Sequence, residues 1–573
     1  MAARKATPRK KSKSPKGAGN GMATFSMHAF DESAAPAFAK LEEERGSHPM
    51  FAMEGAAGLP HLDPETVAQR YLTQALESKA VPSLTAPKSE GQTASFKSLG
   101  TETIPLTGTT MVKFRQAFND IPVYGSLVSV ELDENNELVS INSSLGEPQG
   151  VAPVAKIAPA DAIKSVQKYP GYQKDLTGIV PHLSYYFDAP RSKWRLVFIL
   201  EDVAVTGPKG PKAADPKPGP KFMDYMVDAQ TGAVVAELPR TPSMASVMES
   251  APDAKNISRQ IRIEVSGKTK TLQDKTLNIQ TFDFKFSDPD VNSKKLPGTA
   301  IKNPPKWTPS AVSAHANAEA VADFLRTTMK RNNIDNKGGP MNSSINCVVA
   351  AESSDGRQWF NAFWNGVQMV YGQVKNGTAL VSLAMDLDVV AHEMFHGVTD
   401  ATSRLEYALQ SGALNESYSD IFGITIANFS NLDPRTWNWK VGEGLSPDGK
   451  AFRDMSNPTL FGQPDNMKNF KVLPNTQNGD FGGVHTNSGI HNKAAFNIFT
   501  AQDTAGNLAL TTLEVAQVFY LTLTQQLSRT SQFTDSRRGA LVSAQTLFRT
   551  LTPAQQKVKL DAIAAGFTAV GIV

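Results

Sequence analysis

The chain has 573 residues, of which 40% are apolar and 20% are charged, and its formal net charge at pH 7 is +3. This length predicts three to five domains of about 100 to 200 residues each, with an ordinary globular composition. No run of about 18 apolar residues occurs, which excludes a helical membrane span. The single cysteine, Cys347, excludes an intrachain disulfide, and we interpret it as a small buried apolar residue.

Positive charge is concentrated at the N-terminus, where residues 1–21 contain seven Lys or Arg and no acidic residue. Removing these seven charges from the net charge of +3 leaves −4, so the remainder is mildly acidic. The segment lacks the apolar core of a classical signal peptide. We predict that residues 1–60 form a disordered basic head and linker, and we expect no specific nucleic-acid partner.

Residues 61–240 are predicted to mix helices and strands. Asp63 followed by Pro64 favours a helix that ends near Glu77. Alternating apolar residues at 123–132, a turn at 133–136 and a second alternating run predict a hairpin with one buried face. Further elements are a helix at 161–168, strands at 183–187 and 194–200, a strand pair within 224–237, and an exposed Pro- and Gly-rich loop at 206–221.

The rest of the chain predicts an α+β region. A small polar stretch at 241–256 is interpreted as a linker. Residues 257–402 mix strands with a helix at about 314–331 and then begin the metal-site helices. Residues 403–573 are mostly helical, with an interruption at about 431–483 that is rich in Gly, Pro, Asn and Asp.

The segment H-E-M-F-H at 392–396 contains candidate metal ligands and a candidate catalytic base. On an α-helix, positions i and i+4 share a face, so His392 and His396 can bind one cation. Glu393 lies beside them, where it can act as the base for an attacking water. Glu416 and Asp420 follow on a second predicted helix, where one can complete the zinc site and the other can orient a ligand imidazole.

An isolated H-E-x-x-H motif also occurs on solvated helices without function, so the two later carboxylates carry the inference. A protein core would not otherwise gather two imidazoles and three carboxylates. The sequence therefore predicts a zinc peptidase.

Four longer motifs occur in order and together resemble the thermolysin family of neutral zinc metalloendopeptidases. The likeness covers roughly residues 256–573, while I-P-V-Y-G-S-L-V-S-V-E-L and Y-M-V-D-A-Q-T-G-A-V-V-A upstream resemble the propeptide modules of such proenzymes. The motifs are N-A-F-W-N-G-V-Q-M-V-Y-G, D-V-V-A-H-E-M-F-H-G-V-T-D, S-G-A-L-N-E-S-Y-S-D-I-F-G and G-G-V-H-T-N-S-G-I-H-N-K-A-A-F.

The resemblance implies two propeptide modules, at 61–105 and 106–240, followed by a catalytic domain with a β-rich lobe and a helical lobe. It also implies a role for each matching residue. It implies His392, His396 and Glu416 as zinc ligands, Glu393 as general base and proton shuttle, His485 and Tyr407 as oxyanion donors, and Asp420 and Asp480 as carboxylates that orient the histidines. It also implies substrate contacts by Asn361, Ala362 and Arg453, and an apolar pocket with Phe452 and Val389 in its wall.

The sequence differs from the family at the positions that bind calcium. Asp388 and Glu443 match a carboxylate cluster that holds a calcium pair, but Ala427, Asn438 and Lys440 stand where acids are expected. Lys450 likewise replaces an acid at another family calcium position. Because an ammonium group repels divalent cations, we predict that the paired site is lost.

The resemblance implies a proenzyme that cuts peptide bonds on the N-terminal side of large apolar residues, after removal of a propeptide that inhibits it. Its partners are protein or peptide substrates. It also implies secretion, although the absence of a classical signal leaves non-classical export or an intracellular peptidase open. The alternative from another class is a catalytically silent binding protein whose propeptide permanently blocks the cleft.

Overall fold

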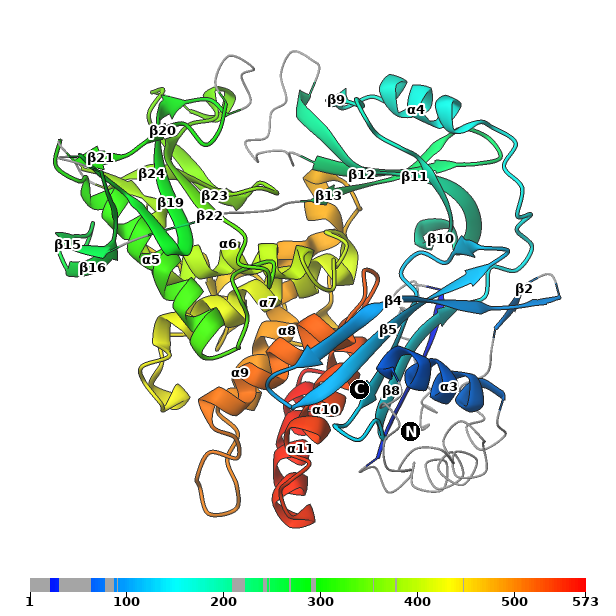
Figure 1. Cartoon of the computed structure of the whole chain (residues 1–573). Coiled ribbons are helices and arrows are strands. Elements are labelled where there is room, and N and C mark those ends of the chain that lie inside the picture. The colour runs from blue at the N-terminus through cyan, green and yellow to red at the C-terminus, as the bar shows by residue number, and fades with distance from the viewer. Residues whose placement is uncertain are drawn as a thin grey trace, which may run out of the picture.

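The computed structural model describes residues 21–29, 63–77, 87–89, 91–208, 222–240, 245–246, 248–266, 269–289, 295–303, 305–353, 355–376, 379–446 and 448–573. Figure 1 shows two N-terminal sheets beside a larger C-terminal part, which consists of a third sheet and a group of helices. The expected α+β class is confirmed. Within these ranges, no helix is long and apolar enough to cross a membrane.

The first N-terminal sheet has the strand order β1-β8-β7-β5-β4, with antiparallel neighbours, and β6 pairs with β5. Helix α3 (Pro64–Glu77) has the bounds that the sequence predicts. It covers the sheet with buried Tyr71 and Leu72. The strands of this sheet are β1 (Met22–His28), β4 (Ser95–Ile104), β5 (Thr109–Phe118), β6 (Ile121–Pro122), β7 (Leu127–Leu132) and β8 (Leu138–Gly146). Strands β2 (Lys88–Ser89) and β3 (Gln92–Thr93) pair with each other in a separate two-stranded sheet.

Three expectations for this region are corrected. Within the predicted disordered head at 1–60, Met22–His28 forms strand β1; residues 1–20 and 30–60 lie outside the described residues. The module boundary predicted at 105/106 falls inside the β4–β5 hairpin. The β7–β8 hairpin is buried on both faces instead of one, because its second face packs on helices of the C-terminal part.

The second N-terminal sheet has the order β10-β11-β12-β13, with β9 pairing with β11. The helix and strands predicted from the sequence are all present. The loop predicted at 206–221 begins later, because residues 206–208 still belong to β11 and pair with β9. Residues 209–221 lie outside the described part. The elements are α4 (Pro159–Lys168), β9 (Tyr172–Asp175), β10 (His182–Asp188), β11 (Lys193–Pro208), β12 (Phe222–Asp228) and β13 (Val234–Arg240).

The β-rich lobe is built on a seven-stranded sheet with the order β14-β19-β22-β24-β23, in which β20 also pairs with β19 and β25 with β24. Strand β23 is an edge strand of this sheet. Helix α5 (Pro309–Thr327), which begins earlier than predicted because Pro309 starts it, packs on this sheet. The strands of the lobe are β14 (Ala245–Ser246), β15 (Met248–Pro252), β16 (Ser258–Arg262), β17 (Glu264–Ser266), β18 (Thr269–Thr271), β19 (Gln273–Ser287), β20 (Thr299–Ala300), β21 (Lys302–Asn303), β22 (Met341–Cys347), β23 (Trp359–Trp364), β24 (Met369–Asn376) and β25 (Ala379–Ser382).

The predicted linker at 241–256 is only partly a connection. Residues 241–244 and 247 lie outside the described residues, but β15 pairs with β16 in a hairpin of the β-rich lobe. Arg259 forms an ion pair with Asp253 at 3.2 Å, which ties the turn of this hairpin together.

The helical lobe contains α6 (Leu387–Asp400), α7 (Leu409–Asn428), α8 (Asp480–Phe499), α9 (Thr512–Leu521), α10 (Phe533–Leu547) and α11 (Pro553–Ala569). A β carbon on Gly412 would lie 2.3 Å from Cγ1 of Val484, so the glycine lets α7 approach α8 closely. Short elements are the strands β26 (Lys440–Val441) and β27 (Arg453–Asp454), the π-helix η8 (Thr522–Gln526), and the 3₁₀ turns η1 (Ala189–Arg191), η2 (Ala350–Glu352), η3 (Leu383–Met385), η4 (Pro434–Thr436), η5 (Pro458–Phe461), η6 (Met467–Asn469) and η7 (Gln477–Gly479).

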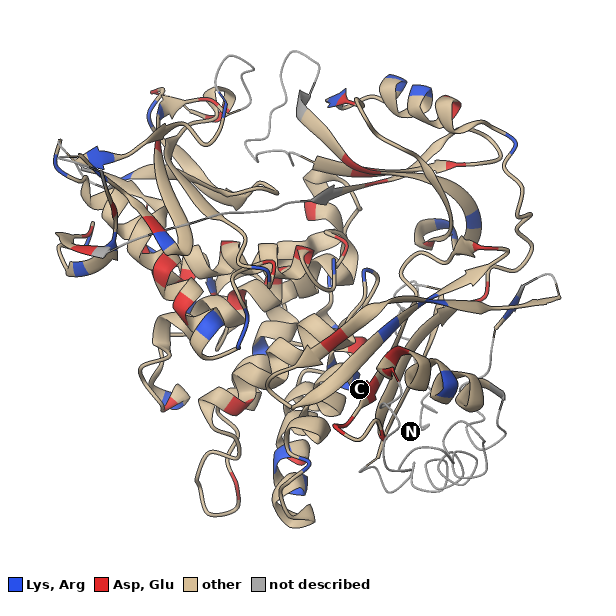
Figure 2. Ribbon diagram, in the orientation of Figure 1, with Lys and Arg blue, Asp and Glu red and all other residues tan. Residues whose placement is uncertain are grey.

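The N-terminal sheets pack directly on the C-terminal part. Ile104 and Met111 of the β4–β5 hairpin belong to the largest buried cluster, which is otherwise formed by the C-terminal part. Ala408, before α7, packs with Tyr124 and Met226 of the N-terminal region. Figure 2 shows that basic and acidic residues occur in all of these units.

Candidate metal centre and active site

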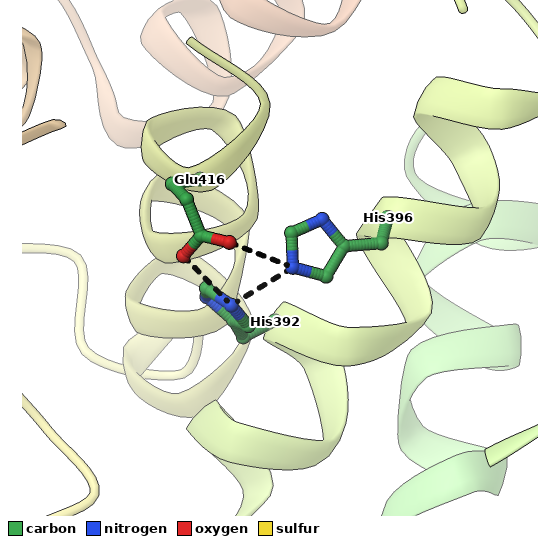
Figure 3. A group of neighbouring side chains, drawn as sticks. All are labelled: His392, His396 and Glu416. Carbon is green, nitrogen blue, oxygen red and sulfur yellow. Dashed lines mark hydrogen bonds and ion pairs between the residues drawn. The ribbon is translucent and has the colours of Figure 1, made fainter. Parts of the chain in front are cut away.

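The two imidazoles predicted to bind a metal come from α6 and point toward α7 (Figure 3). His392 Nε2 and His396 Nε2 are 3.1 Å apart, and they lie 3.6 Å and 3.5 Å from the two carboxylate oxygens of Glu416. Among the described residues, this is the only cluster of three His, Cys, Asp or Glu side chains whose ligand atoms all lie within 4.8 Å. The structure thus brings together the predicted ligand set.

Three features of this cluster fit a divalent transition metal. Oε2 of Glu416 is buried and has no hydrogen-bond partner, which is costly unless a cation satisfies it. Burial lowers the pKa of His396 to about 4, so its ring is neutral, as a metal ligand requires. Burial opposes ionisation of Glu416, but the neighbouring His485, His396 and His392 hold its pKa well below the usual range, so it is anionic.

Asp420 orients the ring of His392 through the nitrogen that does not face the metal cluster. Its Oδ1 lies 2.8 Å from Nδ1 of His392, which leaves Nε2 of the ring for the metal. Burial alone would lower the pKa of His392, but the carboxylates of Asp420 and Glu416 raise it. Arg453 binds Asp420 with Nε and Nη2 at 2.8 and 2.7 Å, so this predicted substrate contact also holds the carboxylate in place.

Three supporting residues were missed in the sequence. Nδ1 of His396 lies 2.8 Å from Oδ1 of Asn415 and 3.1 Å from Oγ of Ser419. Nδ2 of Asn492 donates to Oδ2 of Asp420 at 2.8 Å. The four-residue spacing of Asn415 and Ser419 on α7 could have identified both as facing α6.

Glu393 lies next to the end of the edge strand β23. Its Oε2 accepts a hydrogen bond from the backbone N–H of Trp364 at 3.1 Å. Burial raises the pKa of Glu393 to about 7, because the charged carboxylate is desolvated and lies near Glu416. Its side chain is therefore poised for proton transfer near neutral pH.

Tyr407 and His485 converge on the same side of the cluster. The Tyr407 hydroxyl donates to Oε1 of Glu416 and lies 3.0 Å from Nε2 of His485. Desolvation and the nearby carboxylates raise the pKa of Tyr407 well above its usual value, so the phenol keeps its proton.

A left-handed loop positions His485. Asp480 and Phe481 both have positive φ, of 55° and 47°, and the two glycines that follow, at 482 and 483, continue this conformation. The loop turns Asp480 back onto the helix start, where it accepts from the backbone N–H groups of His485 and Thr486. Its other oxygen lies 2.6 Å from Nδ1 of His485. Burial favours the neutral ring, but Glu416 and Asp480 raise the pKa of His485.

The predicted substrate-binding residues lie on both sides of this centre. Asn361 and Ala362 are on β23, whose outer edge is unpaired in the described sheet. Val389 and Phe452 belong to one apolar cluster with Leu445, against which Ala362 also packs. An extended peptide could add to β23 as a further strand and place a side chain against this cluster.

The two carboxylates that match the family's calcium cluster, Glu443 and Asp388, make contacts within the protein. Oε1 of Glu443 pairs with Lys440 at 3.1 Å, and Oε2 accepts from Nδ2 of Asn438 at 2.8 Å. Asp388 is buried and accepts from the backbone N–H groups of Gly442 and Val389.

Three family models match the chain: the Fungalysin/Thermolysin Propeptide Motif at residues 94–145, the Thermolysin metallopeptidase, catalytic domain, at 250–400, and the Thermolysin metallopeptidase, alpha-helical domain, at 403–572.

Similar proteins were found in bacteria. Bacillolysin of Bacillus amyloliquefaciens is 33% identical over 78% of this chain and 81% of its own length. Bacillolysin of Bacillus subtilis (strain 168) is 35% identical over 61% of this chain, which spans 62% of that relative. Among solved structures, the precursor of protealysin, a metalloproteinase from Serratia proteamaculans, has a TM-score of 0.41 with 28% identity, covering 52% of this chain and 87% of its own.

Proposed function

This chain belongs to the thermolysin family of metallopeptidases, and on that premise we propose that it is a zinc metalloendopeptidase made as a proenzyme. The observation that carries the proposal is the cluster of His392, His396 and Glu416, with Glu393 beside it and an unsatisfied buried oxygen on Glu416. These three residues would hold the zinc ion. When bound, zinc would polarise the scissile carbonyl group and favour deprotonation of the attacking water.

Glu393 is proposed as the proton shuttle. Its carboxylate accepts a proton from the attacking water as the bond from oxygen to the carbonyl carbon forms, and it returns that proton to the amide nitrogen as the C–N bond breaks. The backbone N–H of Trp364 holds one carboxylate oxygen of Glu393, which leaves the other for this exchange.

The carbonyl oxygen becomes negatively charged during the attack and needs hydrogen-bond donors. The Tyr407 hydroxyl and Nε2 of His485, 3.0 Å apart, are proposed as these donors. Asp480 keeps the proton on Nδ1 and supports a protonated ring, because its carboxylate raises the pKa of His485 against the effect of burial. The two donors lie beside Glu416, so they would face a carbonyl held at the metal.

We further propose that cleavage occurs on the N-terminal side of large apolar residues. The substrate would run along β23, with backbone contacts to Asn361 and Ala362, and its apolar side chain would pack on Val389 and Phe452. The apolar cluster that contains these two side chains supports this specificity. Arg453 would contact the substrate backbone while it stays paired with Asp420.

The N-terminal region is proposed as an intramolecular inhibitor that is removed by a cut within 241–256. Arg529 of the helical lobe supports a tight association, because it donates to Oε1 of Glu201 at 2.6 Å and to the hydroxyl of Tyr124 at 3.1 Å. Secretion is proposed on the family resemblance alone, and comparing the amount of enzyme in culture medium and cell lysate tests it.

One experiment tests the activity and the processing together. The purified chain and its Glu393→Gln variant are incubated with zinc and followed by mass spectrometry and by casein hydrolysis, with and without a chelator. We expect self-cleavage within 241–256 and chelator-sensitive hydrolysis for the native chain, and for the variant neither, although it retains zinc. Full zinc loading without hydrolysis by the native chain would support the silent binding protein instead.

A further inference from the structure

Strand β1 lies well upstream of the matched propeptide motif, yet it completes the first sheet. It pairs antiparallel with β8 over seven residues, from Met22 opposite Gly146 to His28 opposite Ser140. The other side of β8 pairs with β7. Strand β1 therefore covers an edge of the sheet that would otherwise present unpaired backbone groups.

The same strand contacts helix α10 of the helical lobe near its first turn. Nη1 of Arg538 donates to the carbonyl oxygen of Phe25 at 3.1 Å and to that of Ser143 at 3.4 Å. Phe25 and Ser143 are direct partners in the β1–β8 ladder. One guanidinium from α10 thus holds both strands of this pair.

A second contact joins the end of β1 to the last turn of α10. Oγ1 of Thr546 lies 2.9 Å from Nε2 of His28 and donates to Oε2 of Glu131 on β7 at 2.9 Å. Because the hydroxyl has one hydrogen and gives it to Glu131, its oxygen accepts from Nε2–H of His28. His28 is 1% exposed, so this bond is shielded from water.

The buried carboxylate of Glu131 makes this second contact part of a network. It also accepts from Oγ1 of Thr109 at 2.7 Å and from Oγ of Ser140 at 2.9 Å. Ser140 is the ladder partner of His28. Loss of the His28 bond would leave buried polar groups at the junction of β1, β8 and α10 without a full set of partners.

We propose that β1 is a clasp: a strand that fastens the first N-terminal sheet onto α10 and so sets how firmly the N-terminal region stays on the peptidase part. Its two contacts with α10, at Arg538 and Thr546, lie about two turns apart on the helix. Figure 1 shows α10 next to β8. The inference goes beyond the proposed function, since it assigns an interface role to residues outside the propeptide motif.

Hydrogen exchange on the full-length chain tests the clasp without relying on activity. All proteins carry Glu393→Gln to keep the chain intact. His28→Ala should speed amide exchange on the order of tenfold or more in β8 and in the C-terminal half of α10, because a buried interaction is lost. His28→Gln can donate from a similar position and should restore slow exchange. Thr24→Ala, an exposed position on the same strand, should change neither segment.

The outcomes separate the clasp from a passive strand. Faster exchange confined to β1 and β8, with α10 unchanged in His28→Ala, would overturn the proposal. Equal effects of Thr24→Ala and His28→Ala would also overturn it, because the contact with α10 would then not be the cause. A catalytically inactive native chain would contradict the proposed function but would leave this exchange result intact.

Discussion

Asn492 on α8 donates a hydrogen bond from Nδ2 to Oδ2 of Asp420 on α7, 2.8 Å away, and both side chains are fully buried. The hydroxyl of Ser417 donates to the amide oxygen of Asn492 at 2.6 Å, which fixes the orientation of the amide. Asp420 therefore receives donors from His392, Arg453 and Asn492 at once. Contacts between α6, α7 and α8 therefore hold the proposed metal ligand His392 in its orientation.

Asn492→Leu should weaken zinc binding while the chain stays folded. Without the amide donor, Asp420 loses one of its restraints and His392 is held less well, and loss of such an outer partner typically costs about 10- to 100-fold in metal affinity. Competition with a chromophoric chelator on the Glu393→Gln background measures the dissociation constant of zinc.

Asn497→Leu is the matched control, since Asn497 lies on the same helix but its amide faces the carbonyl of Gly566, with a long contact of 3.5 Å. If Asn492→Leu binds zinc as tightly as this control, the positioning role of Asn492 is wrong.

Tyr407→Phe and His485→Gln should both lower kcat with little change in KM. Each removes or weakens a donor that acts as charge develops on the carbonyl oxygen, and loss of one such donor costs about 10²- to 10³-fold. Because the two groups lie 3.0 Å apart and share one task, the double variant should lose less than the product of the single losses. Steady-state kinetics on a peptide substrate measures this, and a loss seen only in KM would argue for ground-state binding.

His491 should make the chain less stable in acid. Burial lowers its pKa to about 3, while an unfolded histidine titrates near 6.5. The unfolded state therefore takes up the proton first, so stability contributed by neutral His491 is present above pH 6.5 and is lost as pH falls toward 3. The loss is about 1.4 kcal/mol for each pH unit in that window.

His491→Gln removes this titration while it can keep hydrogen bonds to Ser417 and Ser536. As the pH falls from 6 to 4, the unfolding free energy of the variant should therefore rise relative to that of its parent. Denaturant unfolding on the Glu393→Gln background measures this difference. A difference that stays constant with pH would show that His491 is not the titrating group.

The sequence predicted the ligand cluster because its information is local. His392 and His396 share one helix face, and the distance to Glu416 allows one turn and a second helix. Asn492 was missed because its contact depends on how α8 packs against α7, which no spacing encodes. Strand β1 was missed for a similar reason, since its partners β8 and α10 are more than 100 residues away.

The burial of both faces of the β7–β8 hairpin was also not predicted, because it depends on packing against a distant part of the chain. Alternation correctly predicted the strands, but Ser129 and Asn142, polar on the pattern, are buried against the carbonyl groups of Gln525 and Gln526. Serine and asparagine on one face of a strand predict that this face is exposed to solvent, unless the surface that packs on it is known.

Calcium should be absent from the position that Lys440 occupies. Lys440 and Asn438 both contact Glu443, and a divalent ion there would have to displace an ammonium group and tolerate its charge. Plasma mass spectrometry of chelator-washed protein reloaded with zinc and calcium should find one zinc and no calcium pair. Lys440→Asp, which supplies a further acidic oxygen, should increase calcium binding, measured by calorimetry. Two calcium ions per zinc in the native chain would contradict the prediction, because the lysine would then be compatible with the paired site.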